Sequence, residues 1–137
     1  MSERQFVRLR MLQGSVIRNL SLQQLLRYGW ILPLSETPAR HLFDQYLARH
    51  GAPVPSQIVE TSSISTIRGL LLESDRVALL SRHQAFYDEQ AGLLVALPIR
   101  LEGTWRPIGI TTRAHTTPSP AARLFIDCLR RLAAKPF

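Results

Sequence analysis

The sequence predicts an α/β fold with a mostly parallel sheet flanked by helices. Residues 57–60 and 77–80 each have the pattern of a short strand, and apolar side chains recur at helical spacing between them, at Ile64, Ile67 and Leu71. The second strand is fully apolar and bounded by polar residues, which is typical of a strand buried on both faces. Two strands joined by a helix form a βαβ unit, whose strands run parallel in one sheet.

Composition supports one small globular protein. The chain has 137 residues, of which 45% are hydrophobic and 20% charged, a balance that can build a core. No apolar run reaches the length of a transmembrane helix, and the N-terminus lacks the continuous apolar stretch of a secretory signal. Cys128 is the only cysteine, so an intramolecular disulfide is excluded. We expect a cytoplasmic protein without cofactor, metal or membrane association.

The formal net charge of +7 is unevenly distributed. Residues 1–30 carry +4, residues 31–92 carry −2 and residues 93–137 carry +5. Basic ends could contact a polyanion through its phosphates. The only adjacent basic pair is Arg130-Arg131, and no aromatic stacking platform is interleaved with the arginines, so direct nucleic-acid binding by this chain is not the favoured interpretation.

The N-terminal third contains several short elements. Residues 5–12 alternate loosely between apolar side chains and arginines, which indicates an edge strand. Ser21 then has the place of an N-cap for a short helix that runs towards Gly29. Residues 30–33 (WILP) predict a short strand closed by proline. We expect Trp30 to lie in the core and not to serve as a ligand platform.

The next helix has clear signals at both ends. Thr37-Pro38 is a cap followed by proline at the first helical position, and Gly51 ends the helix. The strand at residues 57–60 follows.

Beyond Ser81 the pattern predicts a short helix, two more strands and a final helix. Residues 93–101 are apolar but interrupted by Pro98, which favours an edge position or a crossing between lobes. Residues 107–112 are a further strand candidate. Ser119-Pro120 opens the last helix. Its apolar stripe consists of Leu124, Phe125, Cys128, Leu129 and Leu132.

Three hydroxyl side chains, Thr61, Ser62 and Ser63, stand where the first strand of the βαβ unit gives way to its helix. Helix N-termini present free N–H groups and the positive end of the macrodipole, so an anion or a polyol could be held there. The alternative is that one of these hydroxyls simply caps the helix.

Enzyme motifs are lacking in the sequence. It has no Walker-type phosphate loop, no Gly-x-Ser-x-Gly elbow and no His-Glu-x-x-His pair. We therefore expect no catalytic activity. The histidines, which show no local ligand spacing, are His41, His50, His83 and His115.

The order of these elements resembles the distal part of the effector-binding domain of LysR-type transcriptional regulators. The resemblance runs from about Leu20 to Leu132 through the segments WILP, AGLLVALP and RPIGITTR and the final helix. It implies a type 2 periplasmic-binding-protein fold, in which two α/β lobes hinged by crossing strands hold a small molecule between them. By this resemblance, residues 30–92 form one complete lobe. Residues 1–29 lead into the hinge, and residues 93–137 supply the returning strand and helix of an incomplete second lobe.

The resemblance also implies where a ligand would bind. Arg82 could pair bidentately with a carboxylate or could be a solvated surface arginine, and His83 could contact the ligand or have no such role. The implied effector-binding residues are Pro33, Leu34, Ser35, Thr61, Ser62, Ser63, Ser81, Arg82 and His83.

Two functions follow as hypotheses. The chain is either the effector-sensing and oligomerising module of a LysR-type regulator, without its helix-turn-helix DNA-binding domain, or a free-standing ligand-binding or interaction protein, a truncated gene product associating with itself or with intact regulators. The partner in either case is a small organic metabolite, an anion or a polyol, and DNA contact requires a module absent from this chain. The exposed stripe of the last helix predicts a homo-oligomer, or a cover formed by residues 6–12.

Overall fold

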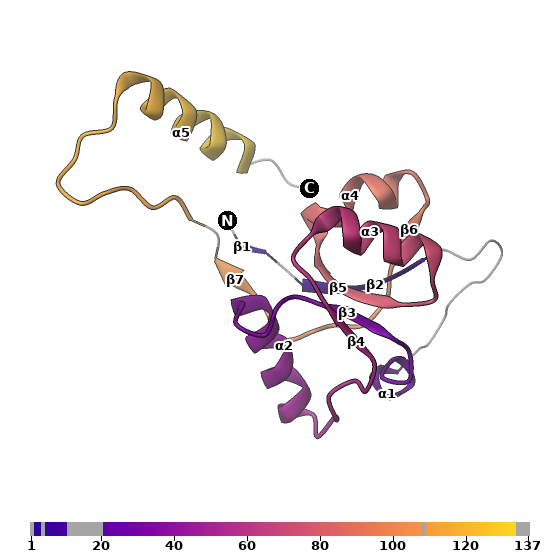
Figure 1. Cartoon of the computed structure of the whole chain (residues 1–137). Helices are drawn as coiled ribbons and strands as arrows, with labels where there is room; N and C mark the ends of the chain where they lie inside the picture. Colours follow the sequence, from indigo (N-terminus) through magenta and orange to yellow (C-terminus); the bar gives the residue numbers. More distant parts are fainter. Residues whose placement is uncertain (1, 4, 11–20, 108, 134–137) are drawn as a thin grey trace. The chain divides into compact units, whose positions relative to one another are not determined.

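The computed structural model describes residues 2–3, 5–10, 21–107 and 109–133. The chain forms two units (Figure 1). The first comprises residues 4–105, and the second comprises residues 1–3 and 106–137.

The first unit is organised around a five-stranded sheet of order β4-β3-β5-β2-β6. β3 pairs in parallel with both β4 and β5, whereas β2 runs antiparallel to its neighbours β5 and β6. The two strands predicted for the βαβ unit, β4 and β5, therefore lie parallel in one sheet, as expected, with β3 between them. The strands are β2 (Gln5–Arg10), β3 (Trp30–Leu32), β4 (Ile58–Glu60), β5 (Val77–Ser81) and β6 (Leu94–Ala96).

The prediction of an edge strand at residues 5–12 is wrong. β2 pairs on one side with β5, where Val7 lies opposite Leu79, and on the other side with β6. A short alternating pattern does not encode strand neighbours, because both partners lie far away in the sequence. The same pairing places residues 5–10 inside the sheet of the first unit, while residues 11 and 12 lie outside the described part of the chain.

Helices cover both faces of this sheet (Figure 1). On one face, α1 (Leu22–Leu25) and α2 (Pro38–Arg49) pack around Trp30 and Leu32. On the other, α3 (Ile64–Glu73) and α4 (Arg82–Gln90) pack around Ile31, Ala78 and Leu80. Successive residues of a strand point to opposite faces, so β3 and β5 are buried on both sides. This confirms the expectation drawn from the apolar run at residues 77–80.

Trp30 lies at the centre of the first layer. Its side chain is fully buried, its ring centroid lies 5.2 Å from that of Phe43, and its indole N–H donates to the Leu25 carbonyl at 3.0 Å. A buried indole with a satisfied N–H is a core residue, which confirms the interpretation made from the sequence.

The predicted N-caps are present. Ser21 accepts from the Gln24 N–H, and Thr37 accepts from the Arg40 N–H with Pro38 at the first helical position. α2 is followed by Gly51 at a φ of +58°, a conformation that favours glycine.

β6 is shorter than the predicted strand over residues 93–101 but lies at the edge of the sheet, as Pro98 indicated. Residues 97–105 continue from it as the last segment of the first unit. We call this segment the connector.

In the second unit, β1 (Ser2–Glu3) pairs antiparallel with β7 (Arg106–Pro107). The strand predicted at residues 107–112 is not formed over residues 109–112. The final helix, α5 (Pro120–Ala133), begins after Ser119 as predicted, and the Ser119 hydroxyl accepts from the Ala122 N–H. Among the described residues, no helix is long and apolar enough to cross a membrane.

Candidate functional site

Two turns and the start of a helix lie at one edge of the sheet, the edge formed by the carboxyl ends of its parallel strands β3, β4 and β5. The strands run parallel, and Leu32 pairs with Glu60 while Ile31 pairs with Ala78. The residues that follow β3 and β4, and the end of β5, therefore lie at similar heights along the strands. Neighbouring strands lie about 5 Å apart, so the two turns and the start of the helix span roughly 10 Å. In open α/β sheets this edge is the usual ligand position.

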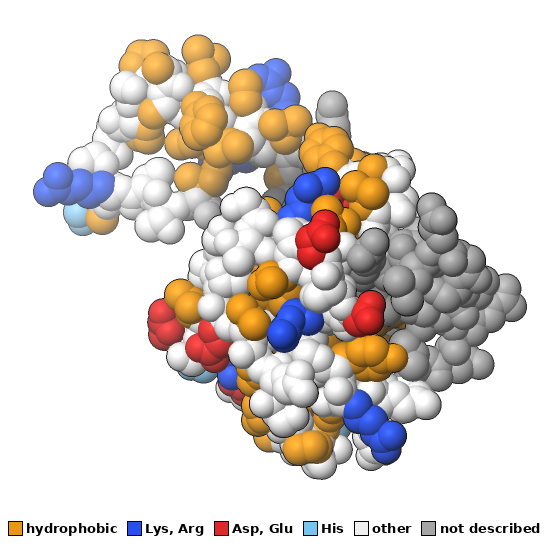
Figure 2. All heavy atoms as spheres, turned by 45° about the vertical axis from the view of Figure 1, so that its right-hand side comes forward, with side chains coloured by type: hydrophobic (Ala, Val, Ile, Leu, Met, Phe, Trp, Pro, Cys, Tyr) orange, Lys and Arg blue, Asp and Glu red, His pale blue; other side chains and the backbone are white. Residues whose placement is uncertain are grey.

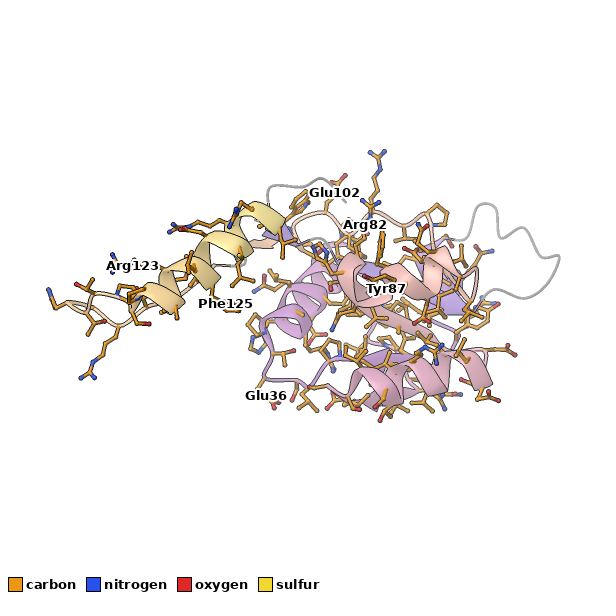
Figure 3. The ribbon with its side chains drawn as sticks, turned by 90° about the horizontal axis from the view of Figure 1, so that it is seen from above. Glu36, Arg82, Tyr87, Glu102, Arg123 and Phe125 are labelled. Carbon is orange, nitrogen blue, oxygen red and sulfur yellow. The ribbon has the colours of Figure 1, made fainter. Side chains whose placement is uncertain are left out.

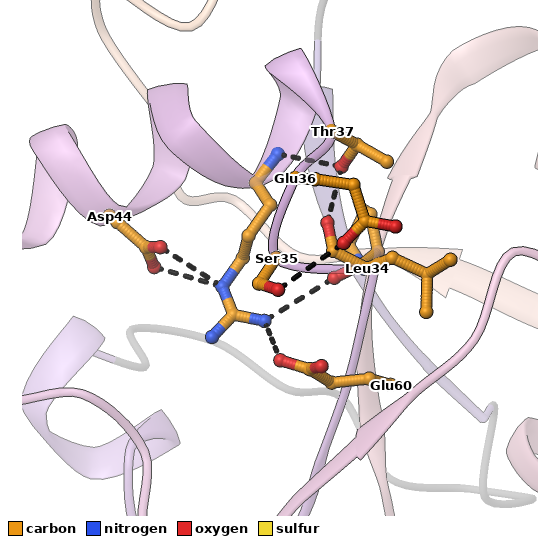
Figure 4. A network of polar contacts seen from close by, with 8 residues as sticks. Leu34, Ser35, Glu36, Thr37, Asp44 and Glu60 are labelled. Carbon is orange, nitrogen blue, oxygen red and sulfur yellow. Dashed lines mark hydrogen bonds and ion pairs between the residues drawn. The ribbon is translucent and has the colours of Figure 1, made fainter.

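A buried arginine, which the sequence analysis did not identify, links the first two turns (Figure 4). Arg40 is only 7% exposed. Its Nη1 donates to the Pro33 carbonyl at 3.3 Å and to Glu60 Oε1, and its Nε donates to both oxygens of Asp44 at 3.0 and 3.1 Å. The end of β3, the end of β4 and the first turns of α2 are thus held by one guanidinium.

The charge of Arg40 is stabilised where it lies. Burial on its own lowers the pKa of Arg40, but hydrogen bonds and attraction from Glu60 and Asp44 outweigh this effect, and the pKa is raised overall. The ion pairs are partly open to water, because both carboxylate side chains remain 39% exposed. Arg40 therefore acts as a permanent charge under the candidate site and not as a proton donor.

The turn after β3 is closed by its own hydrogen bonds. The Leu34 carbonyl accepts from the Thr37 hydroxyl at 2.7 Å and from the Thr37 N–H at 3.0 Å. Pro33 and Leu34 are half-buried, whereas Ser35 is exposed and its hydroxyl donates to Glu36 at 3.3 Å. This turn is rigid at its base and open at its tip.

The hydroxyls after β4 have different roles. Ser63 caps α3 by accepting from the Thr66 N–H at 3.3 Å, and Thr61 accepts from the Ser63 N–H at 3.1 Å. The capping interpretation is therefore confirmed for Ser63. Ser62 and Ser63 are exposed and Thr61 is half-buried, so the turn presents hydroxyls to solvent at a helix N-terminus.

The third predicted group lies at the start of the helix that was predicted beyond Ser81. Ser81 is the last residue of β5 and the N-cap of α4, so Arg82 and His83 occupy the first helical turn. Ser81 is 1% exposed, and both its N–H and its hydroxyl donate to Gln84 Oε1, at 3.0 and 3.1 Å. Arg82 is exposed and has no ion-pair partner among the described residues. Only Arg82 and the half-buried His83 of this group offer side chains to a ligand.

The nine predicted residues thus share one edge of the sheet but are not in mutual contact. Arg40 joins the first turn to the second, while the third belongs to the start of α4. Figure 3 shows Glu36, beside the first turn, well separated from Arg82 on the sheet unit. The charged side chains form two separate groups. Glu36, Asp44 and Glu60 lie around the positive charge of Arg40, whereas Arg82 lies apart from them.

Sequence signals existed for some of the residues that were missed. Arg40 and Asp44 have the i, i+4 spacing of a helical ion pair, and Glu60 directly follows two apolar strand residues. No local signal connects Arg40 with Glu60, because twenty residues separate them and only the parallel pairing of β3 and β4 brings them together.

This edge of the sheet offers hydroxyls, helix N-termini and fixed charges. Within the described ranges, no three His, Cys, Asp or Glu side chains are placed to hold a metal ion.

Comparison with known proteins adds independent findings. The family described as LysR substrate binding domain matches residues 15–134. The HTH-type transcriptional regulator GalR of Pseudomonas putida is 39% identical over 114 residues, and the match covers 83% of this chain and 29% of that protein. The uncharacterized HTH-type transcriptional regulator YdcI of Escherichia coli is 32% identical over 113 residues, covering 82% and 37%.

Solved structures agree on the fold. The regulatory domain of CcmR from Synechocystis, in complex with 2-PG, superposes with a TM-score of 0.71 at 17% identity, covering 98% of this chain and 65% of that one. The regulatory domain of a HypT mutant from Salmonella typhimurium gives a TM-score of 0.66 at 18% identity, covering 98% and 74%. The present chain spans about a third of the length of the curated relatives it matches.

Proposed function

The chain belongs to the LysR substrate binding domain family, and from that premise we propose that it is the effector-sensing module of a LysR-type transcriptional regulator. The observation that carries this proposal is that two turns and the start of α4 lie together at the carboxyl ends of β3, β4 and β5, with hydroxyls, two helix N-termini and Arg82, which has no ion-pair partner among the described residues. The named relatives are transcriptional regulators, and the edge offers binding groups. We assign DNA contact to parts of a regulator outside the matched region, and a cytoplasmic location follows from this role.

The proposed effector is a small organic metabolite that carries an anionic group or several hydroxyls. Glu36, which follows β3, and Glu60, which ends β4, would repel an anion bound near the ends of these two strands. We therefore expect an anionic group to lie near Arg82, where the guanidinium and the N-terminus of α4 both attract it. The hydroxyls of a polyol fit the Thr61–Ser63 turn.

A ligand screen with matched variants tests this proposal. Thermal shift is measured against organic acids, sugars and amino acids, and each hit is repeated with Arg82→Gln and Arg27→Gln. Arg27 is also exposed but precedes β3, at the opposite edge of the sheet. We expect Arg82→Gln to weaken an anionic hit about tenfold or more, as charged hydrogen bonds allow, and Arg27→Gln to leave it unchanged. Equal effects of the two variants, or no hit, would contradict the proposed site.

We further propose that α5 mediates self-association. All side chains of its apolar stripe are exposed, including Leu124 at 66% and Phe125 at 64%, and none of its residues is buried. Figure 2 shows hydrophobic side chains gathered along this helix. An apolar stripe of this kind on a soluble domain favours a protein contact. This observation also favours the second candidate function, an interaction protein that associates with itself or with intact regulators.

A further inference from the structure

Helix α2 connects the candidate site to the segment through which the chain leaves the first unit. It has twelve residues and is therefore about 18 Å long. Its N-cap, Thr37, and Arg40 in its first turn hold the turn after β3 and the end of β4. Its last turns carry Tyr46 and Arg49, which hold the connector, residues 97–105.

The contacts at the far end of α2 are specific. The buried Tyr46 hydroxyl donates to the Arg100 carbonyl at 3.1 Å, and Arg49 Nη2 donates to the Glu102 carbonyl at 3.4 Å. Gly103 lies directly against the Arg49 guanidinium, since a Cβ at this position would be 2.7 Å from Nη1. The connector is therefore attached to α2 by hydrogen bonds at Arg100 and Glu102 and by close packing at Gly103.

Packing strengthens this attachment. Leu97 and Leu101, both almost fully buried, belong to the same apolar cluster as Phe43, Tyr46 and Leu47 of α2. Tightly packed groups transmit small displacements because no void absorbs them. A shift of α2 at its N-terminal end therefore cannot occur without strain at the connector.

We infer that α2 is a rigid link through which occupancy of the sheet edge changes the position or order of the connector. A ligand that contacts the turn after β3, or competes for Glu60, alters the anchoring of Arg40. The helix carries that change to Tyr46 and Arg49, and so to the chain as it passes into the second unit. Coupling of this kind is reciprocal, so loosening the connector also loosens the site.

The inference rests on the proposed function for the nature of the signal, but its test needs no ligand. Hydrogen exchange, followed by mass spectrometry, is measured on the 137-residue chain with Glu60→Gln and with Glu36→Gln as the matched control. Both variants remove one negative charge beside the same turn, but only Glu60 binds Arg40. A hydrogen bond of ordinary strength changes a local opening equilibrium about two- to tenfold.

We expect Glu60→Gln to speed exchange about two- to tenfold both at residues 33–41 and at residues 99–104, with α3 unchanged, and Glu36→Gln to leave residues 99–104 unchanged. Faster exchange at residues 33–41 alone overturns the inference. If Glu60→Gln also speeds exchange in α3, exchange is measured in a second variant, Tyr46→Phe, which removes a contact at the far end of α2. Faster exchange at residues 33–41 in Tyr46→Phe supports the link, and unchanged exchange there overturns it. If no compound of the ligand panel binds, the proposed function is contradicted, but the hydrogen-exchange result on α2 and the connector is not affected.

Discussion

Replacement of Arg40 by methionine tests how strongly the buried guanidinium holds the candidate site together. The variant keeps an unbranched side chain but leaves Asp44, Glu60 and the Pro33 carbonyl without their shared donor. Removing one partner of a buried ion pair costs about 3–5 kcal/mol. Both carboxylates are 39% exposed, so water solvates them in the variant. We therefore expect a loss at or somewhat below the lower end of this range, about 2–3 kcal/mol.

Urea unfolding followed by circular dichroism measures this loss. With a slope of about 2 kcal/mol per molar, the midpoint falls by about 1–1.5 M. Arg68→Met is the matched control, because the Arg68 side chain is 49% exposed where it pairs with Asp88, whose own side chain is 17% exposed, at 2.9 Å. An ion pair whose arginine is solvated contributes about 1 kcal/mol or less. If Arg68→Met costs as much as Arg40→Met, the reasoning about burial is refuted.

Three further predictions concern the core, the pH dependence and the second unit. Leu71→Ala, at a fully buried position, is expected to lower the free energy of unfolding by about 2–5 kcal/mol, measured by the same urea titration. Burial and the charge of Glu102, partly offset by Arg49, raise the pKa of Tyr46. Its contribution to stability is therefore complete below about pH 10, the unfolded value, and is lost as the pH rises further. Tyr46→Phe should flatten this alkaline fall in unfolding free energy, and an unchanged slope would contradict the assignment. Phe125→Glu should reduce self-association in sedimentation velocity, while Arg123→Glu, roughly 160° away around α5, should not; equal effects would argue against the apolar face.

Much of the first unit could be predicted because its signals are local. Caps at Thr37 and Ser63, proline at the start of α2 and the apolar run of β5 each depend on a few neighbouring residues. The position of β2 could not be predicted in this way. Its neighbours are chosen by packing between distant segments, and an alternating pattern fits an interior antiparallel strand as well as an edge strand.

The candidate site was predicted at the level of turns but not of contacts. Parallel strands bring their carboxyl ends together, so three hydroxyl-bearing turns could be expected at one edge. The network around Arg40 was not predicted, because it depends on the register that sets Leu32 opposite Glu60. The short helix predicted beyond Ser81 begins at Arg82, and Ser81 and Gln84 have the spacing of a capping box.

The most direct test of the account is a titration followed by two-dimensional ¹H–¹⁵N NMR with a compound that raises the melting temperature. If the sheet edge is the effector site, the largest shifts fall on residues 34–35, 61–63 and 81–83, which end or follow β3, β4 and β5. Shifts confined to α5, or to Arg27 and Arg76 at the opposite edge of the sheet, would contradict it.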